Sequence, residues 1–250
     1  MNMVSRILLS QLPVLALLSF SPAQAGELTI GAMGAYASSP YKDYDDRFLP
    51  IPLVSYEDER FFVRGAGAGV HIWKDATHEL SVGLSYLPHE FDNGRTDDRR
   101  LKKLDNRHAG LNVDLLYQMK GEWGAASLKV SRDIIGNSDG FSGDLAYRYP
   151  LVYGKLSVNP GVGVVWESEK QLDYYYGVSD RESRKSGLKS YDPGNGFSPY
   201  LSLNAGYALT ENWSLTAGGK ITFLSSEIKD SPMVDDSYRV EAFVGVAYSF

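Results

Sequence analysis

The C-terminal stretch YRVEAFVGVAYSF, residues 238–250, decides the fold class. Apolar residues alternate with charged or small residues along its whole length, which is the period of a β-strand with two different environments on its two faces. Val244, Val246, Tyr248 and Phe250 share the apolar face. We expect these four side chains to face membrane lipid and the opposite face to line the interior of a barrel.

The same alternation recurs through the chain in segments of about ten residues, a length that crosses a bilayer when the strand is tilted. A soluble β-sandwich is the alternative, but its strands are usually about 5–6 residues long. Apolar faces that end in aromatic residues, opposite faces that carry charges, and long strands favour a membrane barrel. The candidate strands are residues 27–37, 49–57, 61–73, 79–88, 109–119, 123–133, 140–149, 154–167, 197–209, 212–224 and 238–250.

The connections alternate between short and long, which is typical of outer-membrane barrels. Tight turns are expected at residues 121–122, 152–154 and 211–212, and long polar loops at 92–107, 168–196 and 225–237. The sequence therefore predicts an all-β, transmembrane, antiparallel β-barrel with its long loops outside.

The number of strands is expected to be even, as it is in bacterial single-chain barrels. Eleven candidate segments leave one unresolved, and residues 49–73 are the weak zone. Pro50 and Pro52 weaken a strand, and the glycine-rich run at 65–69 is compatible with a bend between two short strands. We predict twelve strands, with ten as the alternative.

Residues 1–25 read as a secretory signal peptide, and residues 26–250 as the barrel domain. Arg6 precedes a mostly apolar run, and Ala23-Gln24-Ala25 supplies a small-residue cleavage site. The formal net charge of -6 excludes a typical nucleic-acid-binding protein, which carries a basic face. The chain has no cysteine, which excludes disulfides and thiolate metal sites.

An enzyme is not expected. The chain has four histidines and neither a G-x-S-x-G nor an H-E-x-x-H motif, so no nucleophile–base arrangement can be recognised. Acidic groups at residues 43–46 and 235–236 do not follow an EF-hand spacing. We expect no cofactor and no metal site.

Five segments carry a resemblance to a known family: residues 40–45 (PYKDYD), 52–57 (PLVSYE), 174–179 (YYYGVS), 198–200 (SPY) and 230–235 (DSPMVD). They resemble the MltA-interacting protein family, also called the MipA/OmpV family, over essentially the whole mature chain. The resemblance implies an outer-membrane location in a Gram-negative cell envelope. It also implies a scaffold role toward a lytic murein transglycosylase and a bifunctional penicillin-binding protein.

Two kinds of surface are candidate interaction sites. The loop at 168–196 combines aromatic and basic residues, which favour interface hot spots, although a loop packed on itself over the barrel mouth is the alternative. The basic run at 95–107 could meet lipopolysaccharide phosphates, or it is a solvated loop. Periplasmic partners would instead meet the short turns. The candidate residues are Tyr174, Tyr175, Tyr176, Arg181, Arg184 and Lys185 in the loop, and Glu122, Tyr153 and Glu211 at the turns.

The leading functional hypothesis, on the resemblance, is a non-enzymatic scaffold or adaptor for enzymes that synthesise and hydrolyse peptidoglycan. A narrow pore for small solutes is the first alternative, because a barrel of about twelve strands is narrow. A surface-binding, adhesin-like protein that uses the 168–196 loop is the second.

Overall fold

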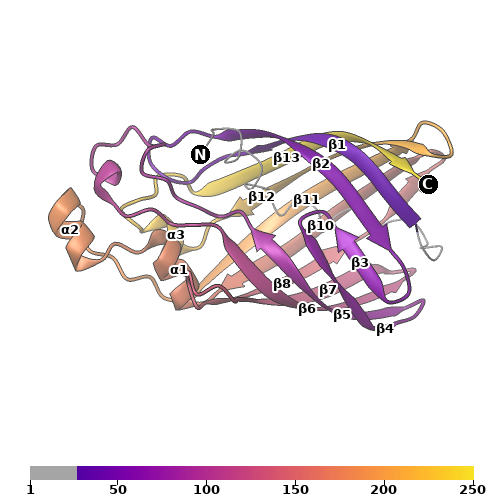
Figure 1. Cartoon of the computed structure of the whole chain (residues 1–250), viewed down its shortest axis with the longest axis horizontal. Coiled ribbons are helices and arrows are strands. Elements are labelled where there is room, and N and C mark those ends of the chain that lie inside the picture. Colours follow the sequence, from indigo (N-terminus) through magenta and orange to yellow (C-terminus); the bar gives the residue numbers. More distant parts are fainter. Residues whose placement is uncertain (1–26) are drawn as a thin grey trace.

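The computed structural model describes residues 27–250, so the predicted signal peptide lies outside the described residues. Thirteen strands alternate with turns and loops along the chain (Figure 1). They are β1 (Glu27–Ala37), β2 (Arg47–Glu57), β3 (Phe61–Arg64), β4 (Gly67–Lys74), β5 (His78–Leu87), β6 (Gly110–Gly121), β7 (Gly124–Asp133), β8 (Phe141–Arg148), β9 (Leu151–Tyr153), β10 (Leu156–Glu167), β11 (Gly196–Ala208), β12 (Trp213–Phe223) and β13 (Tyr238–Ser249).

The strands form one closed antiparallel barrel. Strands that follow one another in the chain pair, except that β8 and β9 both pair with β10. β1 pairs with β13 as well as with β2, so the first and last strands join. Closure leaves no sheet edge at this seam, which a membrane-spanning sheet requires because lipid offers no hydrogen-bond partners.

The barrel has twelve wall strands, as predicted. β8 and β9 both pair with β10 and form one wall strand, interrupted at residues 149–150. The predicted segment 61–73 is two strands, β3 and β4, joined at Gly65, whose φ of 61° is the left-handed conformation that glycine adopts freely. The turn between the two short strands is therefore at Gly65–Ala66, the start of the glycine-rich run, and the rest of the run belongs to β4.

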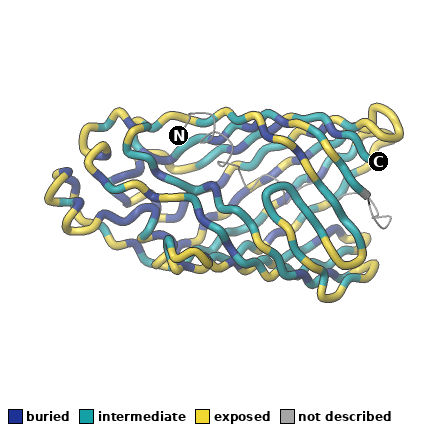
Figure 2. Tube along the Cα trace, viewed as in Figure 1, coloured by how far each residue is buried: buried dark blue, intermediate teal, exposed yellow. Residues whose placement is uncertain are grey.

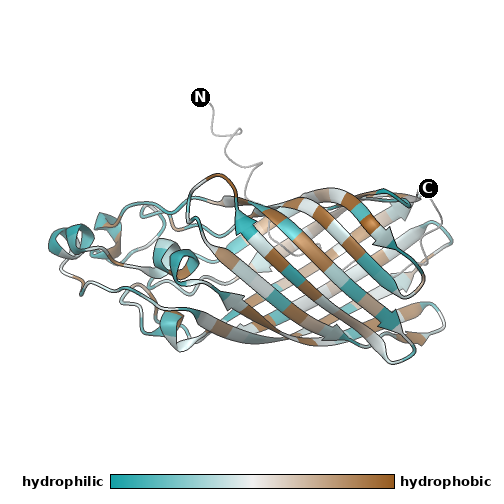
Figure 3. Ribbon diagram, turned by 90° about the horizontal axis from the view of Figure 1, so that it is seen from below, coloured by the Kyte–Doolittle hydropathy of each residue, from teal (hydrophilic) through white to brown (hydrophobic). Residues whose placement is uncertain are grey.

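The two faces of the wall follow the sequence alternation (Figure 3). On β13, Val244 is 61% exposed on the outside of the barrel, whereas Glu241 on the inner face is 6% exposed. An inner apolar cluster lies on β13, β1 and β2, where Phe243, Met33 and Leu53 pack together. Outer apolar and inner polar surfaces in one strand are what a lipid-facing barrel wall requires.

One end of the barrel is covered by a cap made of the long connections (Figures 1 and 2). The cap contains α1 (Glu169–Tyr176), α2 (Asp180–Ser186), α3 (Ser226–Lys229) and a 3₁₀ helix at Leu101–Lys103. Ser168, Ser179 and Ser225 each cap the N-terminus of a helix through the side-chain oxygen. Among the described residues, no helix is long and apolar enough to span a membrane.

The cap and the short turns lie at opposite ends. Short turns are periplasmic and longer loops are external in barrels of this kind, so the cap end is assigned to the outside. The C-terminus lies at the turn end (Figure 1), which this assignment places in the periplasm.

Candidate functional site

The cap has a hydrophobic core of its own, to which all the long connections contribute. Isolated β-bridges at Tyr41–Val234 and Tyr44–Thr96 tie the connections together. The core residues are Tyr41, Phe91, Leu101, Leu104, Leu172, Tyr175, Tyr176, Val178, Leu188, Leu224, Ile228, Met233 and Val234. Packing of this extent makes the cap an ordered plug over the outer mouth rather than a set of solvated loops.

The three consecutive tyrosines belong largely to this core. Tyr175 and Tyr176 are 1% exposed, and Tyr174 is partly buried against them. The Tyr174 hydroxyl accepts a hydrogen bond from the His108 N–H at 2.8 Å. Tyr175 and Tyr176 are therefore unavailable for a recognition surface, and their role in this structure is to pack the loop over the barrel mouth.

A buried ion pair connects the two halves of the cap. Arg107, from the connection between β5 and β6, donates to Glu182 of α2 at 2.9 Å, and Glu182 also completes the capping box with Ser179. Burial opposes the ionisation of Glu182, but the Arg107 charge and the hydrogen bonds from Asp105 and Ser179 hold its pKa below the ordinary value. Removing one partner of such a pair would leave an uncompensated buried charge.

The basic residues of the 168–196 loop lie on the outer surface of the cap. Arg181 pairs with Asp105, and Lys185 lies 3.8 Å from the same carboxylate. Arg184 is exposed near the end of α2. The three basic candidate residues of the loop thus form a small cationic patch on the outer surface of the cap.

His89 lies at the junction between the cap and the lumen. Its Nε2 atom is 3.1 Å from the Tyr176 hydroxyl and 3.4 Å from the Tyr41 hydroxyl, and its ring stacks on Tyr175. Burial lowers the pKa of His89 from 6.5 to about 3, and the nearby Arg239 charge acts in the same direction. The imidazole is therefore neutral at physiological pH.

Below the cap, the lumen contains a cavity of about 380 Å³. Its wall carries charges from several strands: Lys220 pairs with Glu241 at 2.7 Å, and the Tyr200 hydroxyl donates to Asp144 at 2.9 Å. The buried side-chain polar atoms of Asn204 and the Ser202 hydroxyl have no hydrogen-bond partner in the described part of the chain. Buried polar groups are normally paired with protein or water, so this part of the lumen is suited to a solvated or ligand-occupied interior.

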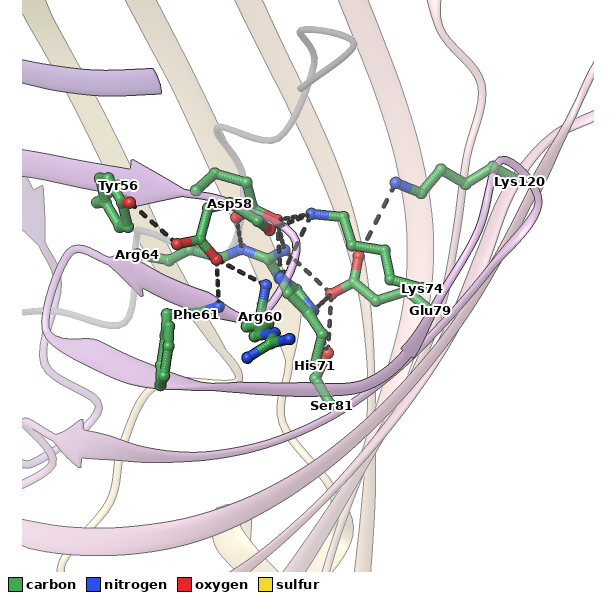
Figure 4. A network of polar contacts seen from close by, with 11 residues as sticks. Tyr56, Asp58, Arg60, Phe61, Arg64, His71, Lys74, Glu79, Ser81 and Lys120 are labelled. Atoms are coloured by element: carbon green, nitrogen blue, oxygen red, sulfur yellow. Dashed lines mark hydrogen bonds and ion pairs between the residues drawn. The ribbon is translucent and has the colours of Figure 1, made fainter. Parts of the chain in front are cut away.

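A polar network fixes the short β3–β4 hairpin to its neighbours at the turn end of the lumen (Figure 4). Arg64 donates to Glu57 at 2.9 Å and to Glu79 at 3.0 Å, and Lys74 donates to Glu57 at 2.6 Å. His71 contacts Glu57 at 3.0 Å. These contacts join β2, β3, β4 and β5, and they reinforce the β2–β3 pairing, which is short because β3 has only four residues.

Within the described residues, one group of acidic and histidine side chains is close enough to hold a metal ion, and it belongs to this network: Glu57, His71 and Glu79. Its donor set does not suit a cation, because Arg64 and Lys74 already neutralise both carboxylates from within the network. A metal ion would have to displace these two positive charges.

The predicted periplasmic residues lie at the end opposite the cap. Glu122 and Glu211 are exposed in the turns after β6 and β11. Tyr153 is 65% exposed, but it ends β9, and the turn itself is Gly154–Lys155 rather than residues 152–154. The prediction of a tight turn is correct here, but the turn lies one or two residues further along the chain than predicted.

The predicted membrane-facing residues of β13 and the C-terminus all belong to the outer surface. Val244 and Phe250 are exposed, and Val246 and Tyr248 are half-buried, because Tyr248 packs against Trp213 and Phe250. The aromatic group lies near the turn end of the barrel, where interfacial aromatic girdles occur.

Sequence reasoning missed the polar residues that organise the cap. His89 and Arg107 read as polar rim or solvated loop residues, and Glu182 reads as one of several loop charges. The Ser179–Glu182 spacing, the S-x-x-E pattern of a capping box, was the available signal for Glu182. No local signal indicates the burial of His89, because it arises from contacts with residues 48 and 87 positions away.

The closed wall, apolar outer face, polar lumen and alternating turn lengths define a β-barrel outer-membrane protein. The chain matches the family described as "MltA-interacting protein MipA" over residues 30–250. It therefore belongs to the MltA-interacting protein family.

Related proteins cover nearly the whole chain. "MltA-interacting protein" of Escherichia coli (strain K12) is 38% identical over 248 residues, covering 99% of this chain and all of the relative. "Putative outer membrane protein YiaT" of the same strain is 37% identical, covering 94% of this chain and 96% of the relative. OmpV of Vibrio cholerae is 26% identical, covering 87% and 85%. An outer-membrane channel from Pseudomonas putida F1 superposes with a TM-score of 0.49 and 10% identity, covering 93% of this chain and 98% of the channel.

Proposed function

We propose that this barrel is a non-enzymatic scaffold that holds peptidoglycan-processing enzymes at the inner face of the outer membrane. The observation that carries the proposal is the 38% identity, over its full length, to a protein whose name states that it interacts with MltA. A lytic murein transglycosylase is therefore the first partner to test. A bifunctional penicillin-binding protein is the second, on the family resemblance.

The docking face is the turn end of the barrel. Partners in the periplasm can reach the short turns but not the cap, because a hydrocarbon core about 30 Å thick separates the two ends. The turns that join β2–β3, β4–β5, β6–β7, β9–β10 and β11–β12 carry five acids (Asp58, Glu59, Asp75, Glu122, Glu211) and two bases (Arg60, Lys155). This excess of three negative charges favours a partner with a basic surface, since complementary charge steers association.

Exposed aromatic and aliphatic residues accompany these charges. Val152 is 71% exposed, Tyr153 is 65% exposed and Trp123 is 45% exposed. Some of these side chains belong to the interfacial girdle, and those nearest the turns are available to a partner. Aromatic anchors surrounded by charged residues are a common composition of protein–protein interfaces.

Charge reversal tests the proposal. Glu122→Lys combined with Glu211→Lys should weaken co-purification of a lytic transglycosylase with the barrel and reduce the salt dependence of binding. The matched control is Asp97→Lys with Asp180→Lys, which places the same charge change on exposed positions of the cap. Equal loss of binding in both variants, or none in the turn variant, would contradict a docking face at the turn end.

A further inference from the structure

The barrel wall is incomplete on the outer side of the β3–β4 hairpin. β2 pairs with β3 only at residues 55–57, so Arg47–Leu53 have β1 as their only ladder partner within the described chain. The hairpin turns back at residues 65–66, where the Gly65 N–H donates to the Val54 carbonyl at 3.1 Å and the Tyr86 N–H donates to the Ala66 carbonyl at 3.1 Å. Above this turn the wall lacks both strands between β2 and the outer end of β5 (Figure 1).

Two prolines make the open edge of β2 tolerable in a membrane. The Val54 carbonyl points toward β3, and alternate residues of a strand direct their backbone groups to the same neighbour. Pro50 and Pro52 share this parity, so the N–H groups that they lack would have pointed into the open side. Proline at such positions removes unpaired donors and blunts the edge against strand addition, which argues against a partner strand as its occupant.

The lumen cavity reaches this gap in the wall. Its lining includes the lumen-facing Phe62 and Leu87, the hairpin turn residue Ala66, and Leu84 and Tyr86, which belong to the membrane-facing set of β5. Leu84 is 48% exposed. At this point the cavity therefore extends from the inner residues of β5 to residues of its outer face.

The alternative entrance from outside is closed. The cap core covers the outer mouth with fully buried side chains such as Phe91, Leu101 and Leu172. At the upper margin of the gap, Arg47 at the start of β2 pairs with Glu90, which follows β5. This ion pair bridges the two sides where the strands no longer do.

We propose that this gap is a lateral portal through which a small amphipathic molecule passes between the outer leaflet and the lumen. The cavity volume of about 380 Å³ lies in the range of sites for drug-sized ligands. Phe62, Phe243 and Leu87 offer an apolar surface, while Arg64, Lys129 and the unpartnered Ser202 hydroxyl offer polar contacts. The occupant therefore has an apolar body and a polar end, and the portal is independent of the periplasmic scaffold role.

Cysteine labelling in liposomes tests the portal, and the cysteine-free chain gives a clean background. Ser127→Cys places a thiol on the lumen face of β7, and Leu128→Cys, the next residue, places one on the membrane face. The probes are N-(1-pyrenyl)maleimide, which partitions into the bilayer, and a sulfonated maleimide, which does not. We expect the pyrenyl reagent to label Ser127→Cys through the wall.

Closing and widening the portal should move this rate in opposite directions. Ala66→Trp should slow pyrenyl labelling of Ser127→Cys on the order of tenfold, because an indole fills the passage, and leave Leu128→Cys unchanged. Arg47→Ala should speed it by removing the ion pair with Glu90. If Ala66→Trp does not fold, Leu84→Trp fills the gap from the exposed membrane side.

Labelling by the sulfonated reagent can refute the portal. If it modifies Ser127→Cys as fast as the pyrenyl reagent, and neither rate responds to Ala66→Trp or Leu84→Trp, the lumen is reached through its ends and the portal is refuted. Loss of transglycosylase binding in the turn variants has no bearing on these rates, so the two proposals fail separately.

Discussion

Mild acidification is expected to loosen the cap through His89. The closed cap holds this imidazole neutral and desolvated between the Tyr41 and Tyr176 hydroxyls. The charged groups near it are Arg239 and Arg47, which disfavour protonation, and Glu241, which favours it. A proton can be accommodated readily only when the ring reaches water, so protonation favours the open cap.

The magnitude follows from the pKa difference. His89 titrates near 6.5 when hydrated and at about 3 in the closed cap. Between these values the open form binds a proton that the closed form does not, so closure loses stability as the pH falls below 6.5. At pH 4.5 the difference is about two pH units, or about 3 kcal/mol. The pKa of Glu182 is lowered in the closed cap, so protonation of Glu182 reduces the stability of closure only below its ordinary pKa of 4.5. The two groups therefore affect cap closure in separate pH ranges.

Spin-label distances between Arg184→Cys and Asp97→Cys in nanodiscs measure this opening, and both sites are exposed. The distance distribution should broaden between pH 7 and pH 4.5 in the parent chain. His89→Gln keeps a neutral polar group that cannot titrate, and it should abolish the broadening in that window. An identical response of the two proteins would refute the assignment to His89.

Four further outcomes are expected. Val244→Arg should destabilise the folded barrel in lipid by about 2–4 kcal/mol, because it places a charge at a lipid-facing site near the bilayer midplane. Ser127→Arg, which faces the lumen cavity, should cost less, and urea titrations in liposomes measure both. Arg64→Ala should cost about 3–5 kcal/mol, because the buried Glu79 loses the Arg64 contact at 3.0 Å. Lys120→Ala, whose contact with Glu79 is 3.9 Å, should cost under about 1 kcal/mol. Arg184→Cys should react with an impermeant reagent on intact cells, and labelling only after outer-membrane rupture would invert the topology. Purified protein in planar bilayers should show little steady conductance, because the cap covers the outer mouth.

The wall of the barrel could be predicted from the sequence because its forces are local. Each strand alternates with period two, and lipid on one side and a polar lumen on the other impose the same rule at every position. Even the bend at Gly65 was visible as a glycine-rich run between prolines and aromatic residues. The alternation of apolar and polar residues did not predict the environment of a side chain where neighbours distant in the chain determine it. Ala247 lies on the lumen-facing side of the C-terminal alternation, and the sequence does not say whether the interior has room there. In the structure it is 5% exposed and packs against Gly31, so an arginine has no space.

The cap and the portal were decided by tertiary structure alone. The three tyrosines and the loop charges have the composition of a recognition surface, and only long-range packing shows that Tyr175 and Tyr176 are a core. Likewise Pro50 and Pro52 read as weakened strand residues, and their meaning depends on a missing neighbour that the sequence does not display. Periodicity reports which face of a strand is apolar. It cannot report which strand stops short or which loop folds back, because those depend on contacts between residues distant in the chain.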